Sequence, residues 1–539
     1  MTLLVASEIT PLAAPPLPKG RPNLVLAGFM GTGKSTVGRL AAHELGLPFL
    51  DLDDAIVRRS GRSVAQIFAD DGEAGFRELE RAALLDAAQL SRTVVATGGG
   101  APLDVNAFAP LAASGPVIVL AAAPEELVRR LGAGGGRPLL GDGDSRARIT
   151  TLLESRASAY DGVGRSIDTT GRSAADVASE VVLRYREAAP DRTLALDVAL
   201  RDTTTRVIVG HGALHDAAAL REALPGTLRA AIVADSAVAE THAATVAVAL
   251  RAAGIEPVGP ITLPAGEAAK GVDVLAWLWD RLRAEAIDPS AAIVAVGGGA
   301  ALDVAGFAAA TYARGLPLVN VPTTVLAMAD AAVGGKVAID HAGAKNLVGT
   351  FYPARLVIAD PATCDTLPPE VVREGLAEVV KSLVLAAPTA LELAAEAPLE
   401  WAVEQSLRVK AAFVSADPQD GGVRRALNLG HTFAHAVESA SDHTISHGDA
   451  VAMGLVAAAR LGAMLGTCPP SLAGQIVTVL QRIGLPTAAP PLDEKRLLDA
   501  MSSDKKRAGG AVRFVVPAPG GAALVAGVDP RTAIGLLRE

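Results

Sequence analysis

A glycine-rich segment near the start of the chain has the residue types that hold a nucleoside triphosphate. Residues 28–35 have the sequence GFMGTGKS, which fits the pattern G-x-x-x-x-G-K-[ST]. In such a loop the backbone N–H groups surround phosphate oxygens, Lys34 contacts the β- and γ-phosphates, and the Ser35 hydroxyl binds Mg²⁺. The apolar run 23–27 before the loop predicts the buried strand that this motif requires. A glycine-rich turn with a surface lysine is the alternative, and the strand context disfavours it.

Polar residues farther along the first third of the chain could bind the group that receives the phosphate. Asp51 and Asp53 end a second predicted strand, 48–50, and strand alternation places both carboxylates on one side. One carboxylate could then organise the metal while the other binds an acceptor hydroxyl. Four further features could contact a small acceptor or close over it: Arg77, the glycines 98–100, Arg137 after the glycine-rich run 132–136, and Arg156.

Histidines gather in the last third of the chain and suggest a metal site. His431 and His435 are four residues apart and share one face of a predicted helix, and His447 begins the next helix. Glu378 lies on a predicted helix upstream. One carboxylate and two imidazoles with an open coordination position form a zinc-type site. A single histidine would more often be an ordinary helix residue, so the grouping carries the argument.

The same part of the chain offers groups for a dinucleotide and for a small polyanion. Gly297–Gly299 follow the predicted strand 292–296, where glycines let a pyrophosphate approach the start of a helix. A tight strand-to-helix turn explains the three glycines equally well. Cations lie in motif-like runs, and in an acidic protein they favour a small polyanion over scattered solvated charges; they are Arg314, Lys336, Lys345, Lys381, Lys410, Arg424 and Lys505.

Alternating predicted strands and helices must position these groups. Up to about residue 186 the alternation indicates a parallel sheet with helices on both faces. The charged segment 186–197, which contains Pro190, is the first boundary, and a second α/β alternation follows it. From about residue 361 the pattern changes to successive helices, predicted over 370–387, 401–414, 430–439 and 448–465.

Composition excludes several classes of protein. Half of the 539 residues are hydrophobic and 20% are charged, which excludes wholesale disorder. A net charge of −9 argues against a general nucleic-acid binder. Two cysteines, Cys364 and Cys468, cannot form a disulfide scaffold, and we expect a reducing compartment. We predict no signal peptide and no transmembrane helix, and therefore a cytoplasmic protein without a membrane partner.

The motifs of residues 21–186 together resemble the shikimate kinase family. The matching elements are Asp51–Asp53, the run 76–80 around Arg77, the glycines 98–100, the run 137–139, and Arg156 with Tyr160. The resemblance implies that ATP and Mg²⁺ are cofactors, that Asp53, Arg77, Gly99 and Arg156 bind shikimate, that Arg137 closes over ATP, and that Arg130 lies near adenine. It also implies nucleotide contacts at Gly31, Thr32, Gly33, Lys34, Ser35 and Thr36, metal ligands at Ser35 and Asp51, and catalytic roles for Lys34, Asp53 and Arg137. Another small-molecule kinase, acting on gluconate or a nucleoside, is the alternative.

Residues 196–539 resemble the 3-dehydroquinate synthase family. The matching runs include 297–314, 321–324, 330–336, 375–381, 424–435 and 504–506. The resemblance implies NAD and a divalent metal, Zn²⁺ or Co²⁺, held by Glu378, His431 and His447. It implies NAD contacts at Asp235, Glu267, Lys270, Gly298, Gly299, Asp303, Thr323 and Thr324. It implies a substrate pocket of Arg314, Asp330, Lys336, Lys345, Asn346, Lys381, Lys410, Arg424, Asn428, His435 and Lys505, with catalytic roles for Lys336, Lys381, Asp420 and His435.

One position departs from the pattern of the second family. A glutamate usually precedes the arginine at 424 by four residues, and here Asp420 stands there. The reaction that the resemblance implies oxidises a carbinol of 3-deoxy-D-arabino-heptulosonate 7-phosphate with NAD⁺, eliminates phosphate, returns the hydride, and closes the ring by an aldol addition. A metal-dependent polyol dehydrogenase, or a cyclase for another sugar phosphate, is the alternative for this half.

The two resemblances together predict a bifunctional enzyme of aromatic biosynthesis with an α/β fold. We expect a flexible leader at 1–20, a kinase domain at 21–188, a linker at 189–196, an NAD-binding α/β domain at 197–360, and an all-helical metal- and substrate-binding domain at 361–539. The second resemblance implies a homodimer in which Arg314 reaches the partner's pocket. A kinase half that only senses nucleotide is the non-enzymatic alternative.

Overall fold

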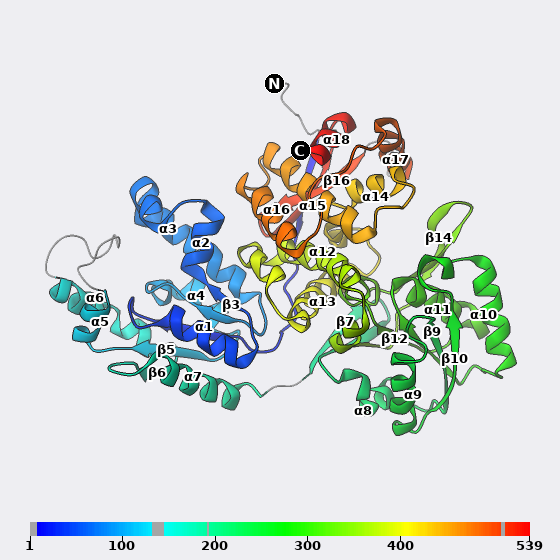
Figure 1. Cartoon of the computed structure of the whole chain (residues 1–539), viewed down its shortest axis with the longest axis horizontal. Coiled ribbons are helices and arrows are strands. Elements are labelled where there is room, and N and C mark those ends of the chain that lie inside the picture. Colours follow the sequence, from blue (N-terminus) through cyan, green and yellow to red (C-terminus); the bar gives the residue numbers. More distant parts are fainter. Residues whose placement is uncertain (1–7, 132–144, 191–192, 508–511) are drawn as a thin grey trace. The chain divides into compact units, whose positions relative to one another are not determined.

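The computed structural model describes residues 8–131, 145–190, 193–507 and 512–539 (Figure 1). The described chain forms two compact units. The larger unit contains residues Met1–Pro18, Thr193–Leu385 and Ala402–Glu539, and the smaller unit contains Lys19–Arg192 and Ala386–Trp401. Each unit is therefore assembled from pieces that are far apart in the sequence.

The smaller unit is built on a five-stranded parallel sheet with the order β3-β4-β2-β5-β6. Every residue of the central strand β2 is buried, which explains its unbroken apolar sequence. Helices α1 and α7 pack together against one face of the sheet. The strands are β2 (Leu24–Gly28), β3 (Phe49–Asp51), β4 (Val94–Ala96), β5 (Val117–Ala121) and β6 (Arg165–Asp168). The helices are α1 (Lys34–Leu45), α2 (Leu52–Ser60), α3 (Val64–Ala88), η1 (Ala101–Leu103), α4 (Val105–Ala112), α5 (Pro124–Leu131), α6 (Ser145–Asp161) and α7 (Ala174–Ala188).

A short segment from much later in the chain completes the smaller unit. This segment, Ala386–Trp401, contains the 3₁₀ helix η7 (Pro388–Ala395) and the first residues of α13 (Leu399–Ala416). Glu400 accepts ion-pair contacts from Arg21 at 2.9 Å and from Arg92 at 2.5 Å, and all three side chains are largely buried. The attraction between the charges of these buried pairs is stronger than in surface pairs, because little water screens it.

The α/β part of the larger unit has a seven-stranded sheet with the order β10-β9-β11-β12-β15-β8-β7. All neighbouring strands are parallel except the edge pair β7 and β8. Helices α8 and α9 form an apolar core with one face of the sheet. The strands are β7 (Leu194–Leu200), β8 (Thr203–Val209), β9 (Arg229–Asp235), β10 (Glu256–Leu263), β11 (Ala292–Gly297), β12 (Leu318–Pro322) and β15 (Leu356–Ala359). The helices are η2 (Ala213–His215), α8 (Ala217–Ala223), α9 (His242–Ala252), η3 (Gly266–Ala269), α10 (Val272–Ala284), α11 (Gly299–Thr311), η4 (Tyr312–Arg314) and the π-helical turn η5 (Ala327–Ala331).

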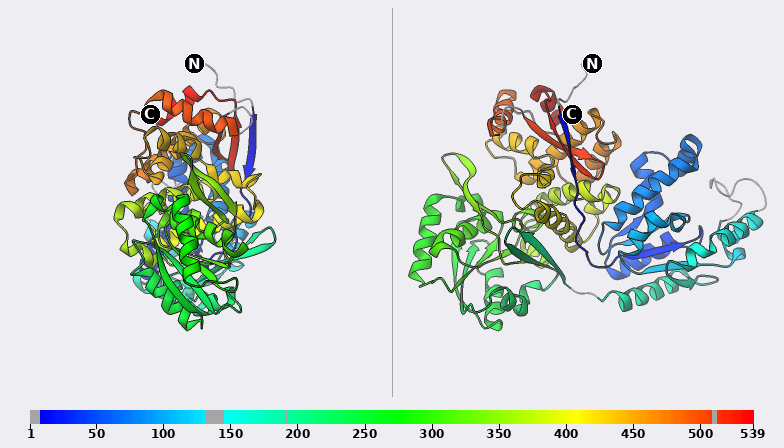
Figure 2. Two further views of the ribbon diagram at one scale, coloured as in Figure 1. Left: turned by 90° about the vertical axis from the view of Figure 1, so that its right-hand side faces the viewer. Right: turned by 180° about the vertical axis from the view of Figure 1, so that it is seen from behind.

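An antiparallel hairpin of β13 (Lys336–His341) and β14 (Ala344–Phe351) projects from this part, as both views show (Figures 1 and 2). The helical part follows, as the sequence predicted. Its helices are η6 (Pro361–Thr366), α12 (Pro369–Ala386), α13, η8 (Val423–Asn428), α14 (His431–Ala440), α15 (His447–Met464), α16 (Ser471–Ile483), α17 (Glu494–Arg507) and α18 (Pro530–Arg538).

The helical part also carries a three-stranded antiparallel sheet that the sequence analysis did not predict. Strands β16 (Arg513–Ala518) and β17 (Gly521–Ala526) form a hairpin, and β1 (Glu8–Ala13) pairs with β17 at the edge. The prediction that residues 1–20 are a flexible leader is therefore wrong for residues 8–13. Pro11 fits an edge strand, because on the side away from the partner strand no N–H donor is needed.

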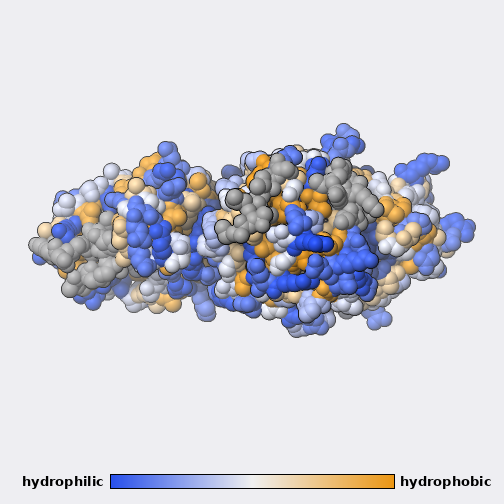
Figure 3. All heavy atoms as spheres, turned by 90° about the horizontal axis from the view of Figure 1, so that it is seen from above, coloured by the Kyte–Doolittle hydropathy of each residue, from blue (hydrophilic) through white to orange (hydrophobic). Residues whose placement is uncertain are grey.

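The described helices give no sign of a membrane span. None of the helices in the described ranges is long and apolar enough to cross a bilayer. On the face drawn in Figure 3, hydrophilic and hydrophobic residues are interspersed.

Candidate active sites

The phosphate-binding loop lies between β2 and α1 in the smaller unit, where the sequence predicted it. Gly33 is the N-cap of α1 with φ 98°, a left-handed conformation that glycine adopts without strain. Gly28 is equally constrained, since a Cβ there would lie 2.2 Å from the Leu120 carbonyl oxygen. Lys34 Nζ donates to the carbonyl oxygens of Gly28 at 2.8 Å and Phe29 at 3.0 Å, so its ammonium group lies over the loop.

Ser35 and Asp51 meet at this loop. Ser35 Oγ donates a hydrogen bond of 2.5 Å to Asp51 Oδ2, and Asp51 Oδ1 accepts from the backbone N–H groups of Asp53 and Asp54. The prediction that strand alternation aligns the two carboxylates is wrong, because Asp51 ends β3 and caps α2, whose first turn contains Asp53. The cap turns the chain, and both side chains still line the same cavity.

This cavity has a volume of about 550 Å³ and extends from the phosphate-binding loop to the glycines 98–100. Arg77 enters it from α3 and pairs with Glu80 at 2.5 Å and Glu73 at 3.0 Å. A Cβ at Gly100 would lie 2.4 Å from an Arg77 nitrogen, so a side chain there would displace the Arg77 guanidinium group. The cavity therefore has a nucleotide end and a second end with a partly buried arginine.

Arg156 supplies a second cation to the same end of the cavity. Its side chain is buried, and one guanidinium nitrogen lies 3.3 Å from the Gly99 carbonyl oxygen. Tyr160, one turn later on α6, donates a hydrogen bond of 2.5 Å to the same oxygen. The structure thus brings Arg77, Gly99 and Arg156 together as the sequence predicted.

Asp53 is a carboxyl group with an altered pKa in this cavity. Burial, together with the negative charges of Asp51 and Glu80, raises the pKa of Asp53 to about 6, although the positive charge of Lys34 opposes the shift. Near neutral pH it is therefore an ionised group that can take a proton readily.

The remaining predicted kinase residues fall at the rim of the cavity or outside the described chain. Arg130 lines the cavity and donates to Thr169, to its carbonyl oxygen at 2.7 Å and to its hydroxyl at 3.0 Å. Gly31, Gly33 and Thr36 also line the cavity, and Thr32 is a buried residue of the loop itself. Arg137 lies outside the described residues.

A second site begins where β11 meets α11 in the larger unit. Gly297 has φ 152° and Gly298 is the N-cap of α11. The two glycines therefore form the turn at the carboxyl end of β11, with no side chain covering its backbone. The Thr323 N–H donates to the Gly297 carbonyl oxygen at 3.0 Å, which places the turn after β12 beside this one. The carboxyl ends of adjacent parallel strands are where nucleotides bind in open α/β sheets.

Polar partners surround this edge. Lys270 Nζ pairs with Asp303 at 2.6 Å and contacts Asn346 of the hairpin. Asp235, at the end of β9, accepts from the N–H groups of Ala237 at 2.9 Å and of Gly266 at 3.2 Å. The structure thus places Asn346 beside a residue predicted to contact NAD. Glu267, from the same predicted set, is exposed on η3.

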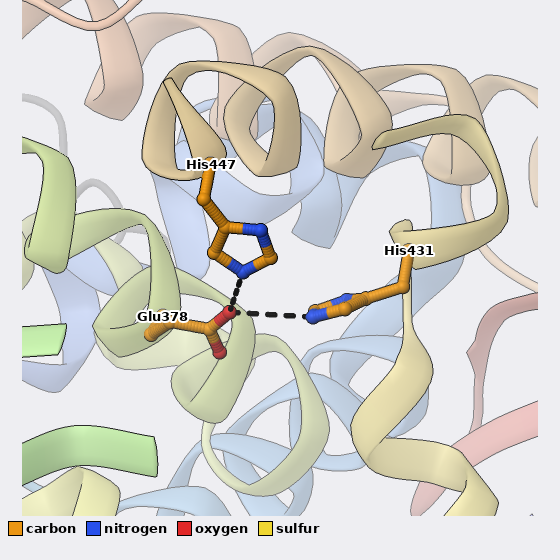
Figure 4. A group of neighbouring side chains, drawn as sticks. All are labelled: Glu378, His431 and His447. Atoms are coloured by element: carbon orange, nitrogen blue, oxygen red, sulfur yellow. Dashed lines mark ion pairs between the residues drawn. The ribbon is translucent and has the colours of Figure 1, made fainter. Parts of the chain in front are cut away.

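The predicted metal ligands converge from three helices of the larger unit (Figure 4). Glu378 lies on α12, His431 begins α14 and His447 begins α15. The Nε2 atoms of His431 and His447 lie 3.4 and 3.7 Å from Glu378 Oε1, and the ligand atoms of all three residues lie within 4.8 Å of one another. This spacing suits ligands around one ion.

The surroundings of Glu378 also fit a cation. Both carboxylate oxygens are buried and accept no hydrogen bond of normal geometry within the described part of the chain. Burial opposes their charge, but Lys381, which forms an ion pair with the carboxylate, acts together with His431 and His447 to hold the pKa of Glu378 well below its usual range. The carboxylate therefore stays ionised and available to a metal.

Cations and carboxylates form pairs next to these ligands. Asp330 contacts Lys410 at 2.5 Å and Lys381 at 3.9 Å, and Lys336 pairs with Asp420 at 2.5 Å. Burial opposes the charge of Asp330, but the two lysines outweigh it and lower its pKa to about 2.

Other predicted pocket residues have different surroundings. Arg424 is buried and donates to the carbonyl oxygens of Pro418 at 3.0 Å and Gly334 at 3.3 Å. The ring of His435 lies perpendicular to that of His431, with centroids 5.7 Å apart. Asn428 and Arg314 are exposed, and the side chain of Lys505 lies outside the described residues.

One residue near the metal ligands was missed by the sequence analysis. Glu438 is buried on α14 and lies 3.5 Å from the second ring nitrogen of His447. Its position three residues after His435 was a usable signal, since it shares the helical face of the histidines.

Family comparisons agree with this geometry. Residues 260–374 match the model for 3-dehydroquinate synthase N-terminal and residues 370–507 the model for 3-dehydroquinate synthase C-terminal. Residues 30–186 match the model for shikimate kinase. A 3-dehydroquinate synthase of Pelobacter propionicus is 41% identical over 298 residues, which are 53% of this chain and 83% of the relative. The chain belongs to the 3-dehydroquinate synthase family, and its residues 30–186 are similar to shikimate kinases. The shikimate kinase match lies in the smaller unit and the 3-dehydroquinate synthase match lies mostly in the larger unit.

Two solved structures resemble the two parts. A 2-deoxy-scyllo-inosose synthase complexed with carbaglucose-6-phosphate, NAD⁺ and Co²⁺ is 25% identical with a TM-score of 0.57, covering 64% of this chain and 99% of its own. A shikimate kinase from Acinetobacter baumannii in complex with shikimate is 35% identical with a TM-score of 0.30, covering 30% of this chain and 92% of its own.

Proposed function

We propose that the smaller unit transfers the γ-phosphoryl group of ATP to the 3-hydroxyl of shikimate. The observation that carries this proposal is one cavity with a phosphate-binding loop at one end and two arginines at the other. Lys34 and the loop N–H groups would neutralise the transferring phosphoryl group, and Ser35 and Asp51 would hold Mg²⁺. Phosphoryl transfer needs positioning and charge neutralisation rather than a covalent intermediate.

The acceptor end of the cavity favours a hydroxylated carboxylic acid. Arg77 and Arg156 provide two cations for a carboxylate, and Asp53 can orient a hydroxyl group and accept its proton. A gluconate or nucleoside kinase would need a different acceptor pocket. The match of residues 30–186 to the model for shikimate kinase supports shikimate among carboxylated acceptors. Arg137 would close over ATP from the segment outside the described residues.

For the larger unit we propose the conversion of 3-deoxy-D-arabino-heptulosonate 7-phosphate to 3-dehydroquinate and phosphate. The convergence of Glu378, His431 and His447 beside a cationic pocket carries this proposal. When bound, a divalent ion there would polarise the substrate hydroxyl, and NAD at the glycine turn would accept and return a hydride. Lys270, Asp303 and the turns at Gly298 and Thr323 would hold the dinucleotide.

The cations would bind the substrate's carboxylate and phosphate. Lys381 and Lys410 share Asp330, and Lys381 also pairs with Glu378, so two carboxylates balance the two ammonium groups. Lys336 and Arg424 would extend this cationic surface. Asp420 still reaches Lys336 although it is one methylene shorter than glutamate, so we assign to it the proton-transfer partner role of the usual glutamate.

The alternative is a cyclase for another sugar phosphate, and one observation favours it. The inosose synthase structure shares the fold of the larger unit and holds a different sugar phosphate analogue. Its identity is 25%, against 41% for the 3-dehydroquinate synthase, so the heptulosonate remains the preferred substrate.

One experiment tests both proposals. The purified full-length protein is incubated separately with shikimate plus Mg-ATP and with the heptulosonate phosphate plus NAD, while ADP and inorganic phosphate are measured. Lys34→Ala should abolish only ADP formation and His431→Ala only phosphate release. Failure of either activity in the intact protein refutes the corresponding proposal, and net NADH production would indicate a dehydrogenase.

A further inference from the structure

The metal ligand His447 has a buried carboxylate behind it. Glu378 Oε1 lies 3.7 Å from His447 Nε2, and Glu438 Oε2 lies 3.5 Å from the other ring nitrogen, Nδ1. Figure 4 shows one nitrogen of this imidazole directed at Glu378 and the other turned away from it. Glu438 is therefore outside the ligand group and contacts only the far side of the ring.

The other histidine ligand is supported in the same way by a different acceptor. His431 Nδ1 lies 3.2 Å from the carbonyl oxygen of Leu429, while its Nε2 lies 3.4 Å from Glu378 Oε1. An oxygen acceptor at Nδ1 favours the tautomer that carries the proton there, which leaves the Nε2 lone pair free for a metal. In both histidines the contacts thus select the same tautomer.

We propose that Glu438 is a positioning residue that fixes the tautomer and ring orientation of His447 for metal binding. This inference rests on the proposed metal site. A carboxylate does more than a carbonyl here, because its charge also raises the basicity of the imidazole. Only 10% of the Glu438 side chain is exposed, so water screens this charge weakly.

The opposite oxygen of Glu438 connects the site to the hairpin. Glu438 Oε1 lies 4.0 Å from Nζ of Lys345, which is on β14. This lysine partly balances the buried charge when His447 is neutral and metal-bound. Glu438 thus links a ligand on α15 to a strand whose next residue, Asn346, contacts Lys270.

The test measures metal binding by the full-length protein rather than turnover. The dissociation constants of Zn²⁺ and Co²⁺ are obtained by competition with a chromogenic chelator, and the Co²⁺ absorption spectrum reports the ligand geometry. Glu438→Ala should weaken binding by about 10- to 100-fold. Glu438→Gln keeps an acceptor for Nδ1–H without the charge, so its loss should be smaller. Asp442→Asn is the control, because that exposed carboxylate pairs with Arg496 and lies outside the group of metal ligands.

The outcomes separate this role from a structural one. Metal affinity within twofold of wild type in folded Glu438→Ala and Glu438→Gln would overturn the proposal. The proposal would also be overturned if the metal-free variants melt at a lower temperature than metal-free wild type and their loss of metal affinity is no larger than this destabilisation explains. If wild type binds no metal, or His431→Ala binds as tightly as wild type, the proposed metal site itself fails. If His431→Ala fails to bind and Glu438→Ala binds normally, only the role of Glu438 fails.

Discussion

Trp401 donates a hydrogen bond from its indole Nε1 to Thr93 Oγ1 over 3.0 Å, joining two buried residues that are 308 positions apart. Thr93 precedes β4, which leads to the glycines of the acceptor cavity. Trp401 lies in the stretch that matches the 3-dehydroquinate synthase family, and yet it is buried in the smaller unit, which matches shikimate kinase. Chain segment 386–401 is part of the kinase unit in structure and part of the synthase in sequence.

Trp401→Ala should therefore destabilise the smaller unit. Removing a buried aromatic side chain costs about 3–5 kcal/mol, and here it also removes a partner of Thr93. We expect shikimate kinase activity to be lost at a lower temperature, measured as residual activity after heating. Trp401→Phe, which removes only the hydrogen bond, should cost about 1 kcal/mol, because Thr93 keeps its bond to the Ser91 carbonyl oxygen.

Trp277→Ala is the matched control for that substitution. Trp277 is 42% exposed on α10 of the larger unit, so its removal should leave the heat resistance of the kinase unchanged. If Trp401→Ala and Trp277→Ala have equal effects on the kinase, segment 386–401 does not complete the smaller unit.

The pH profile of the shikimate kinase reaction should have an acidic limb that reports the protonation of Asp53. Its pKa is about 6, and only the ionised form can accept a proton, so kcat/KM for shikimate should fall as the pH drops through about 6. The Glu80 charge contributes to the raised pKa. Glu80→Gln should therefore shift this limb to lower pH, measured at saturating Mg-ATP. A limb that stays in place or moves to higher pH in Glu80→Gln contradicts the assignment to Asp53.

Much of this site was predictable because its signals are local. The phosphate-binding loop needs glycine at fixed positions and a strand before it. Both patterns lie within a few residues of each other, so the conformation of residues 28–35 can be predicted from the local sequence alone. Long-range packing was not predictable in the same way. Strand β1 buries only Leu12, and its partner β17 lies at the other end of the sequence. The spacing of Glu438 from His435 indicates their shared helical face, but a glutamate on a helix usually faces solvent, and the burial of Glu438 depends on the packing of α15 against α14.

Loss of one histidine ligand should remove the metal and the 3-dehydroquinate synthase activity together. His431→Ala leaves Glu378 and His447, and two ligands do not hold Zn²⁺ or Co²⁺ through dialysis. Metal content and phosphate release should both fall to background, while shikimate phosphorylation continues. His443→Ala is the control, since His443 is exposed after α14 and lies outside the ligand group. Retained metal in His431→Ala would refute the ligand assignment.

Arg314 should serve the active site of a partner subunit. Its side chain is exposed at the end of η4, its φ of 69° is left-handed, and within the described residues it has no hydrogen-bond or ion-pair partner. A two-fold dimer would place two such arginines symmetrically. Mixing Arg314→Ala subunits with His431→Ala subunits should then create one intact synthase site in each mixed dimer, restoring about a quarter of wild-type activity at equal amounts. His431→Ala mixed with Glu378→Ala is the control and should restore none, because both ligands belong to one chain. If subunits exchange, shown by a tag on one variant, and the first mixture stays inactive, Arg314 acts within its own chain.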